Sequence, residues 1–358
     1  MYYREKRRLE KDTRSLLHDD APKRHLERTM IGNQWAREFL ARAANHHVLG
    51  HAYLFLGPPS VGKTSLALHL GALGVCEQAR ENPCGVCRGC RHVKQSSHPD
   101  VRIVERAADR RDITIDQIRE VELDLAMAPY EATRKLVCIA GAEALNESAA
   151  SALLKTLEEP PPRATLVLCA TSPQSLPLTV RSRCQTMLLH PVPAHAIAEG
   201  LHEDLRIEMP RAIELASAAR GRPGWAVRAA TLPELFEREH EAGRQVDALA
   251  TLGPLGKMMA AETWLGKGTF LESRERAMEL FSRLESWWRD ALLETQLSPR
   301  PALAAHLSGE RRNVRVEPRD AVGFLLHIQA AAARVESNVT PRLAVEHLLS
   351  QMPPVGRI

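Results

Sequence analysis

The sequence has few aromatic residues, little net charge and no long apolar run. Phe, Trp and Tyr make up 4% of its 358 residues, and this low content together with abundant Ala and Leu favours helices over a β-sandwich. The formal net charge of +4 does not indicate the dense basic face of a dedicated nucleic-acid binder. No stretch is apolar enough for a signal peptide or a membrane span, so we expect a cytoplasmic chain without a membrane partner.

The length and the residue patterns predict several domains. A chain of 358 residues exceeds the size at which one hydrophobic core keeps growing. Residues 1–28 mix basic and acidic side chains, which predicts a flexible charged extension; binding of an acidic partner is the alternative. Residues 29–190 alternate apolar β-rich runs with helical patterns, and this predicts a parallel sheet covered on both faces. Strand patterns then end, and 191–236 and 237–358 are expected to be helical.

A complete phosphate-binding loop occupies residues 57–64, which read GPPSVGKT. A predicted strand precedes the loop and a predicted helix follows it, which is the context that the motif requires. Backbone N–H groups of such a loop surround a β-phosphate, and the helix N-terminus adds favourable partial charge. The nucleotide-binding residues predicted from this loop are Gly57, Pro58, Ser60, Val61, Gly62, Lys63, Thr64 and Ser65.

The strand that should carry the magnesium-binding acid lacks one. The apolar run at 136–140 ends with Ala140, and Gly141 follows it. A phosphate-loop ATPase needs a carboxylate there, because the cation that it holds stabilises the charge developing on the phosphates. We therefore expect a site that holds or has inherited a nucleotide-binding loop without hydrolysing nucleotide well. If the strand is misplaced, Glu143 is an alternative acid, although a helix beginning near Asn146 leaves Glu143 on a connecting loop. Other carboxylates in the region are Asp100, Glu105, Asp109 and Asp112.

Four of the seven cysteines cluster in one short stretch and are the predicted metal ligands: Cys76, Cys84, Cys87 and Cys90. In a cytoplasmic chain this spacing indicates metal ligation rather than disulfides. Four thiolates suit tetrahedral zinc in a closed structural site. An iron–sulfur cluster is the alternative, although Arg91 and His92 follow where a further cysteine and a proline would be expected. His92 or His98 is a substitute ligand if one cysteine is out of reach.

Two arginines, Arg181 and Arg183, follow the last strand of the α/β segment. An exposed arginine here is a surface charge in one interpretation. In the other, it is supplied to the γ-phosphate of a neighbouring subunit, where it stabilises the charge of the transition state. The residues by themselves leave both interpretations open.

These motifs, in this order, resemble those of the bacterial DNA polymerase III clamp-loader subunits. The resemblance covers about residues 30–228 and is weaker beyond them, where helical character and a WWRD segment are shared. It rests on the phosphate loop, CGVCRGC at 84–90, HPD at 98–100, ALLKTLEEPP at 152–161 and SRC at 182–184.

The resemblance implies a fold and a set of partners. The expected fold is an AAA+ α/β phosphate-loop domain with a parallel sheet and an inserted zinc module at about 76–98, then a helical lid at 191–236 and an all-α collar at 237–358 that joins subunits in a ring. The assembly would load a sliding clamp onto primed DNA in replication. The implied partners are gamma/tau and delta-like clamp-loader subunits and, indirectly, the clamp and DNA; nucleotide is the expected small-molecule ligand.

Within that family, Ala140 and Gly141 are similar to the delta-prime subunits, which are structural and largely non-hydrolysing. The second sensor arginine would fall near Gly224 and is absent, whereas Thr171 resembles the first sensor and joins the predicted nucleotide-binding residues. The resemblance implies that Arg183 is an arginine finger acting in trans. The expected cofactors are structural zinc and ATP with Mg²⁺.

Two other functions stay open at this point. A catalytically active gamma/tau-like ATPase would need Glu143 or another acid to serve the metal ion. An unrelated zinc-containing nucleic-acid-binding protein with a vestigial loop would bind DNA without partners and with a steep salt dependence. As a clamp-loader subunit, the chain would be a component of the polymerase holoenzyme that carries no polymerase site.

Overall fold

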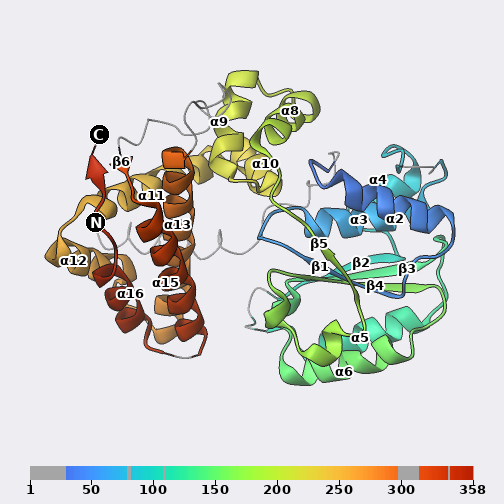
Figure 1. Ribbon diagram of the computed structural model, residues 1–358. Coiled ribbons are helices and arrows are strands. Elements are labelled where there is room, and N and C mark those ends of the chain that lie inside the picture. Colours follow the sequence, from blue (N-terminus) through green and yellow to red (C-terminus); the bar gives the residue numbers. More distant parts are fainter. Residues whose placement is uncertain are drawn as a thin grey trace, which may run out of the picture. The chain divides into compact units, whose positions relative to one another are not determined.

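The computed structural model describes residues 30–78, 82–107, 110, 112–296, 314–337 and 339–357 (Figure 1). The charged extension predicted at 1–28 lies outside these residues. Two compact units divide the chain, Met1–Val227 and Arg228–Ile358. Across the described ranges, every helix is too short or too polar to cross a membrane.

A five-stranded parallel sheet forms the centre of the first unit. Its strand order is β2-β3-β4-β1-β5, and its strands are β1 (Ala52–Leu56), β2 (Val101–Val104), β3 (Lys135–Ala140), β4 (Ala164–Ala170) and β5 (Gln185–Leu188). Every residue of β1 and β4 is buried, because these apolar strands are covered on both faces. The predicted parallel sheet is confirmed.

Helices cover both faces of this sheet (Figure 1). One face carries α2 (Gln34–Asn45), α3 (Lys63–Val75) and α4 (Arg88–Lys94), and the other carries α5 (Ile115–Ala126), α6 (Glu147–Glu158) and α7 (Leu178–Arg181). Side chains alternate along a strand, so Tyr53 and Phe55 join the core under α2 and α3, whereas Leu54 and Leu56 join the core over α5 and α6.

Local sequence determines where α6 begins and ends. The Asn146 side chain accepts a hydrogen bond from the Ala149 N–H at 2.8 Å, which confirms Asn146 as the predicted N-cap. The helix ends at Glu158, just before the prolines at 160–162, which cannot continue it. Two short 3-10 helices, η1 (Ala142–Ala144) and η2 (Pro173–Ser175), follow β3 and β4.

Three helices follow the sheet: α8 (Ala194–Leu205), α9 (Met209–Ala219) and α10 (Pro223–Thr231). Helices α8 and α9 pack against each other. Gly221, with φ +78°, forms the turn before α10. Gly224 does not share that turn but lies in the first turn of α10, because Pro223 begins the helix where no N–H donor is needed.

The second unit is largely helical. It contains α11 (Pro233–Thr251), α12 (Pro254–Leu265), α13 (Phe270–Gln296), α15 (Pro318–Glu336) and α16 (Pro341–Ser350), with a two-stranded antiparallel ribbon of β6 (Val314–Arg315) and β7 (Gly356–Arg357). The division into lid and collar stays a prediction, and α11 runs without a break through its expected boundary at position 236.

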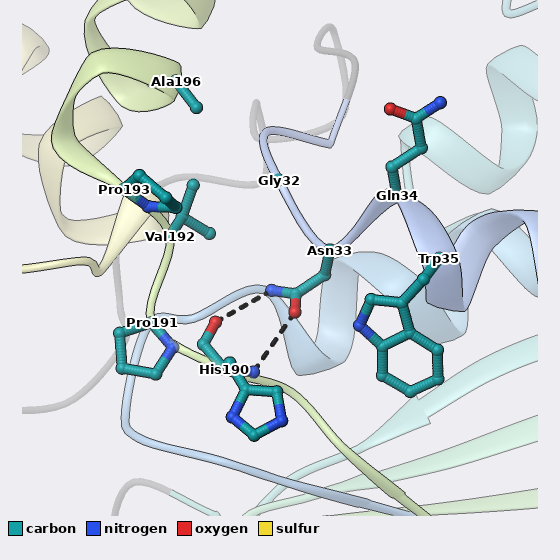
Figure 2. A pocket seen from close by; sticks show the side chains of 9 residues that line it. All are labelled: Gly32, Asn33, Gln34, Trp35, His190, Pro191, Val192, Pro193 and Ala196. Carbon is teal, nitrogen blue, oxygen red and sulfur yellow. Dashed lines mark hydrogen bonds between the residues drawn. The ribbon is translucent and has the colours of Figure 1, made fainter.

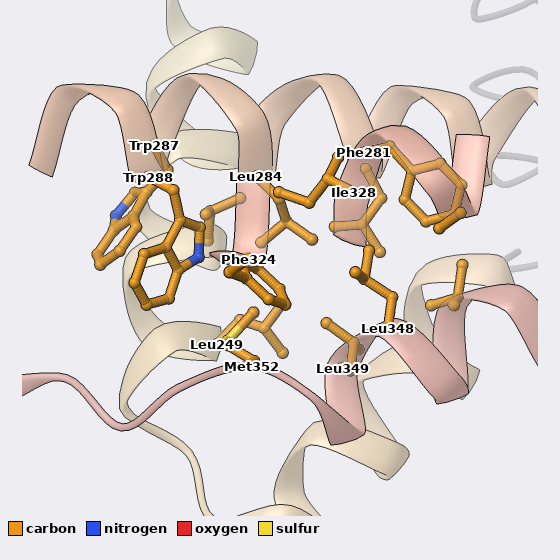
Figure 3. Close-up of a cluster of buried hydrophobic side chains, with 14 of the residues drawn as sticks. Leu249, Phe281, Leu284, Trp287, Trp288, Phe324, Ile328, Leu348, Leu349 and Met352 are labelled. Atoms are coloured by element: carbon orange, nitrogen blue, oxygen red, sulfur yellow. The ribbon is translucent and has the colours of Figure 1, made fainter. Parts of the chain in front are cut away.

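One face of α13 forms the core of this unit. The buried apolar stripe of this helix consists of Ala277, Leu280, Phe281, Leu284, Trp287 and Ala291. The ring of Trp288 contacts that of Trp287 at a centroid distance of 5.2 Å and that of Phe324 at 5.0 Å (Figure 3). Offset and tilted ring pairs of this kind stabilise a core beyond their buried area.

Candidate nucleotide and metal sites

The phosphate loop connects β1 directly to α3. Gly62, with φ +108°, is the N-cap of α3, and Lys63 is the first helical residue. Gly57 adopts φ +150°, and a Cβ atom at this position would lie 2.5 Å from the Leu189 carbonyl oxygen. Only glycine fits both demands at position 57. The predicted strand–loop–helix context is therefore confirmed.

Lys63 is bound by its own loop. Its Nζ donates hydrogen bonds to the carbonyl oxygens of Gly57 at 2.7 Å and Pro58 at 2.9 Å. Burial lowers the pKa of Lys63, while the negative potentials of Cys169 and Glu143 act in the opposite direction. These bonds use two of the three N–H donors of the ammonium group, so a phosphate bound to Lys63 would share it with two internal acceptors.

Helix α10 contacts the loop through backbone atoms. The Gly224 N–H donates to the Ser60 carbonyl oxygen at 2.9 Å, and a Cβ atom at position 224 would lie 3.0 Å from that oxygen. A side chain at position 224, near which the resemblance expects the second-sensor arginine, would require the loop to shift by a few tenths of an ångström. The neighbouring Arg222 donates to the Ala219 carbonyl oxygen at 2.9 Å, and its guanidinium lies 5.7 Å from the Trp225 ring centre.

The ends of β3 and β4 lie at the same sheet edge as the loop. Strand β3 ends at Ala140, and Gly141 follows with φ +70°, so the strand was placed correctly and no acid stands at its tip. Glu143 lies in η1, off the strand, as expected. Its negative charge raises the pKa of Lys63, although burial outweighs this effect. Thr171, the residue after β4, is exposed at this edge.

A cavity of about 390 Å³ opens beside this edge (Figure 2). Asn33 closes one side, because its amide donates to the His190 carbonyl oxygen and accepts the His190 N–H, both at 3.2 Å. The lining residues are Gly32, Asn33, Gln34, Trp35, His190, Pro191, Val192, Pro193 and Ala196. We did not predict this pocket, and the signals for it are the Gly32-Asn33 pair and the Pro-Val-Pro segment at 191–193.

The four predicted cysteine ligands come together between α3 and α4. Their sulfur atoms all lie within 4.8 Å of one another, so they could hold one metal ion; they are Cys76, Cys84, Cys87 and Cys90. Cys76 follows α3, and Cys87 caps α4 by accepting the Cys90 N–H. Gly89 lets the two helices approach, because a Cβ atom there would lie 2.7 Å from the Val75 carbonyl oxygen.

Backbone donors prepare one thiol of this cluster for metal binding. The N–H groups of Val86 and Cys87 lower the pKa of Cys84 to about 6, which favours the thiolate. Burial raises the pKa of Cys90, so a cation would be required to keep that sulfur deprotonated. Since the four cysteines form a complete set, neither His92 nor His98 is needed as a substitute ligand.

Asp100 organises the loop that follows α5. This buried carboxylate, 2% exposed, accepts the N–H groups of Tyr130 at 2.8 Å, Glu131 at 2.7 Å and Ala132 at 2.8 Å. Burial by itself would raise the pKa of Asp100, but these three donors hold it below its ordinary value. The HPD motif thus acts through its acid on a loop about thirty residues away.

The same network connects this loop to the cysteine cluster. The Asp100 N–H donates to Nδ1 of His98 at 3.1 Å, and Nε2 of His98 lies 3.8 Å from Glu131. Glu131 also lies 3.7 Å from the guanidinium of Arg88, the first residue of α4. The cysteine module and the loop at 130–132 are therefore parts of one polar network.

Arg181 and Arg183 differ in their surroundings. The Nε of Arg181 is buried and has no hydrogen-bond partner among the described residues. The side chain of Arg183 is 36% exposed, and one of its terminal nitrogens lies 2.7 Å from a carboxylate oxygen of Glu158. Its other terminal nitrogen donates to the Thr179 carbonyl oxygen at 2.9 Å. Arg183 thus combines access to solvent with a defined side-chain position.

Comparison with known proteins gives several matches. Residues 32–193 match the family described as "DNA polymerase III, delta subunit". The delta-prime subunit of Pseudomonas aeruginosa is 34% identical over 189 residues, which cover 52% of this chain and 57% of that protein. The tau subunit of Bacillus subtilis is 33% identical over 198 residues, which cover 54% of this chain and 35% of that protein. A solved gamma-subunit-related protein of Thermotoga maritima is 20% identical with a TM-score of 0.37, covering 88% of this chain and 97% of that one.

Over residues 32–193 these matches show a delta-prime-like clamp-loader subunit of DNA polymerase III, as the sequence motifs predict. The chain spans less than two thirds of the length of either curated relative. The reading as an unrelated nucleic-acid-binding protein was wrong.

We expect Asp100→Asn to lower the free energy of unfolding by about 2–3 kcal/mol at pH 7, because the charge-assisted hydrogen bonds to three N–H groups are lost. The pKa of Asp100 is lower in the folded state than its ordinary 3.8. Its contribution is therefore complete above the ordinary value and is lost as the pH falls from there toward the folded pKa. Urea unfolding of wild type and variant between pH 7 and pH 3 measures the difference.

The control for this experiment is Asp116→Asn, since the side chain of Asp116 is 81% exposed on α5. Its effect is expected to stay within about 0.5 kcal/mol. A wild-type advantage over Asp100→Asn that is unchanged at pH 3 would show that the ionised carboxylate is not the stabilising group.

Proposed function

We propose that this chain is the structural, largely non-hydrolysing subunit of a DNA polymerase III clamp loader and that it supplies Arg183 to a neighbouring subunit. The observation that carries the proposal is the state of its own phosphate loop. Lys63 is bound by loop carbonyls, Ala140 and Gly141 replace the magnesium acid, and Gly224 occupies the second-sensor position against Ser60.

Hydrolysis requires more than a loop of the right sequence. The metal ion must be held beside the β- and γ-phosphates, a group must orient the attacking water, and cationic side chains must stabilise the transition state. Here the loop geometry supports binding of phosphate by backbone N–H groups and Thr64, with Ser65 next to it. The groups for the later steps are missing from the positions where the resemblance expects them, so weak binding without turnover is the function that this site supports.

The proposed partners follow from the relatives. Those relatives are tau and delta-prime subunits of DNA polymerase III, so we propose that this chain assembles with gamma/tau-type and delta-like subunits and acts indirectly on the sliding clamp and primed DNA. The helical second unit is the proposed collar through which subunits join. We also propose the AAA+ domain division and a cytoplasmic location for this assembly.

We propose zinc as the metal ion of the cysteine module. Four sulfur ligands around one tetrahedral zinc ion lie about 3.8 Å apart, given a Zn–S distance of about 2.3 Å. The observed limit of 4.8 Å fits a single ion at the centre better than a larger multi-iron cluster. Zinc would supply structural stability, because a complete set of four thiolates leaves no open position for substrate.

One observation supports the alternative of an active gamma/tau-like ATPase. The charge of Glu143 raises the pKa of Lys63, so this carboxylate interacts electrostatically with the loop although it lies beyond the strand tip. A carboxylate so placed could serve a magnesium ion through water. The contacts of Lys63 and Gly224 favour the non-hydrolysing function, and ATP turnover decides between the two.

The purified chain is expected to bind ATP weakly and to hydrolyse it at least about a hundredfold more slowly than a tau-type relative assayed beside it. Lys63→Ala should abolish the binding, measured by calorimetry. Ala140→Asp should improve magnesium-dependent binding, whereas Gly141→Glu should destabilise the chain, because φ of +70° disfavours a side chain. Turnover by wild type that Lys63→Ala and Glu143→Gln both abolish would establish the active-ATPase alternative.

Cys84→Ser is expected to release about one equivalent of zinc per chain. Structural zinc sites contribute roughly 10 kcal/mol or more of apparent binding free energy, so the first unit should be strongly destabilised. Metal analysis of the purified variant and its thermal unfolding measure both effects. Cys184→Ser, which changes a cysteine outside the cluster, is the control and should keep the metal. Iron in the wild-type protein, with visible charge-transfer absorbance, would refute zinc.

In a reconstituted clamp loader, Arg183→Ala is expected to leave folding, metal content and assembly intact while lowering DNA-stimulated ATP hydrolysis and clamp loading. Arginine fingers contribute about 10³–10⁵ in rate at one site, but total turnover should fall less because other active sites persist. Arg183→Lys should rescue poorly, since a lysine lacks the planar fork of donors. Arg181→Ala should be milder, and wild-type activity of Arg183→Ala would leave Arg183 a surface charge.

A further inference from the structure

We infer that Glu158 is the positioning residue for Arg183, which it holds ready for the nucleotide of a neighbouring subunit. This inference rests on the proposed trans-acting role of Arg183. Glu158 and Arg183 form an ion pair, although they lie 25 positions apart. Glu158 is near the end of the LLKTLEEPP motif, Arg183 belongs to the SRC segment, and the sequence did not connect these two motifs. One guanidinium nitrogen of Arg183 lies 2.7 Å from an oxygen of Glu158.

Both terminal nitrogens of the Arg183 guanidinium are held by contacts within this chain. One terminal nitrogen donates to the Thr179 carbonyl oxygen at 2.9 Å and to the Ser182 hydroxyl at 3.3 Å, and the other forms the ion pair with Glu158. Two anchors define the plane of a guanidinium, whereas one anchor leaves it free to rotate. The orientation of the donor fork is therefore set within this chain before a partner arrives.

Glu158 itself stands on a rigid support. It is the last residue of α6, and the neighbouring Leu157 and Leu153 of that helix are buried in the core of the first unit. The prolines at 160–162 restrict the backbone immediately after it. Helix α6 also packs against α7, the helix from which the Arg183 segment emerges. The carboxylate is thus placed by the fold and not by a flexible loop.

Stability does not explain this ion pair. The side chains of Arg183 and Glu158 are 36% and 52% exposed, and ion pairs so open to water stabilise a fold little or not at all. A long arginine side chain loses much rotational freedom when it binds a phosphate, and a pre-ordered side chain loses less of it at that moment. The benefit of the Glu158 contact would therefore appear in the reaction of the neighbouring subunit and not in the stability of this one.

The adjacent residue provides a matched control. Glu159 carries the same charge one position farther along, is exposed, and forms no ion pair with Arg183 among the described residues. Glu158→Ala and Glu159→Ala change the net charge equally, so a difference between them reports on the contact with Arg183. Glu158→Gln keeps an acceptor oxygen without the charge and should restore part of the function.

The test measures ATP turnover of these variants in the reconstituted complex. Each loss is expressed as a fraction of the turnover that Arg183→Ala removes. Glu158→Ala should remove at least about half of that Arg183-dependent turnover by lowering kcat with little change in KM for ATP, as expected of a misplaced transition-state group. Glu159→Ala should remove little of it. In an Arg183→Ala background, Glu158→Ala should have no further effect, and the unfolding midpoint of the isolated chain should change by less than ~2 °C.

Different results overturn the trans-acting role of Arg183 and the positioning role of Glu158. If Arg183→Ala has no effect, the trans-acting role falls and the positioning role falls with it. If Arg183→Ala lowers turnover but Glu158→Ala matches wild type or exceeds it, the trans-acting role stands and the positioning role is overturned. A loss in Glu158→Ala that persists in the Arg183→Ala background would also overturn it, because the residue would then act through general structure.

Discussion

Parallel pairing of the buried strands is the constraint on which the candidate nucleotide site depends. Leu56 at the end of β1 pairs with Ala170 of β4 and Leu188 of β5, and Ala140 of β3 pairs with Cys169. The carboxyl ends of these strands therefore lie at one edge of the sheet. A slip of one residue would turn every side chain to the opposite face, so the two apolar cores fix the register. The edge where nucleotide chemistry is possible is thus a consequence of core packing.

The phosphate-loop sequence indicates whether phosphate can bind, whereas the residues around the loop determine whether it can be cleaved. The residues from Gly57 to Thr64 specify a turn whose N–H groups suit phosphate, and this property belongs to the loop alone. Whether a phosphate is then cleaved depends on side chains from β3, β4 and α10, which approach from distant parts of the chain. In this protein the loop retains its form, while β3 is followed by Gly141 and α10 places Gly224 beside the loop. The motif match therefore identifies the loop, and the proposal that it does not hydrolyse nucleotide rests on the neighbouring elements.

The sequence predicted most of what is local and missed what is distant. The apolar run at 136–140 is found as β3, because its residues are buried on both faces of the sheet. Strand β5 was missed, and Arg181 and Arg183 precede it instead of following the last strand, because three of its four residues are exposed and give no apolar run. The cysteine ligands were also found, since they lie close together in the chain. The hydrogen bond between Asn33 and His190 joins residues 157 positions apart, and no local sequence pattern predicts such a pair. The same holds for Gly224, whose contact with Ser60 depends on how α10 packs and not on its own neighbours in sequence.

Asp100 fixes the backbone conformation of the loop at residues 130–132 through the main chain of that loop. Asp100 binds three backbone N–H groups of residues 130–132, and these hydrogen bonds do not depend on the side chains of Tyr130 and Ala132. Tyr130, held in this way, is 81% exposed. A loop whose backbone N–H groups are bound by a buried carboxylate can change its exposed side chains during evolution without losing its conformation. Natural variation among relatives could therefore diversify this patch of surface while a single buried acid preserves the geometry beneath it.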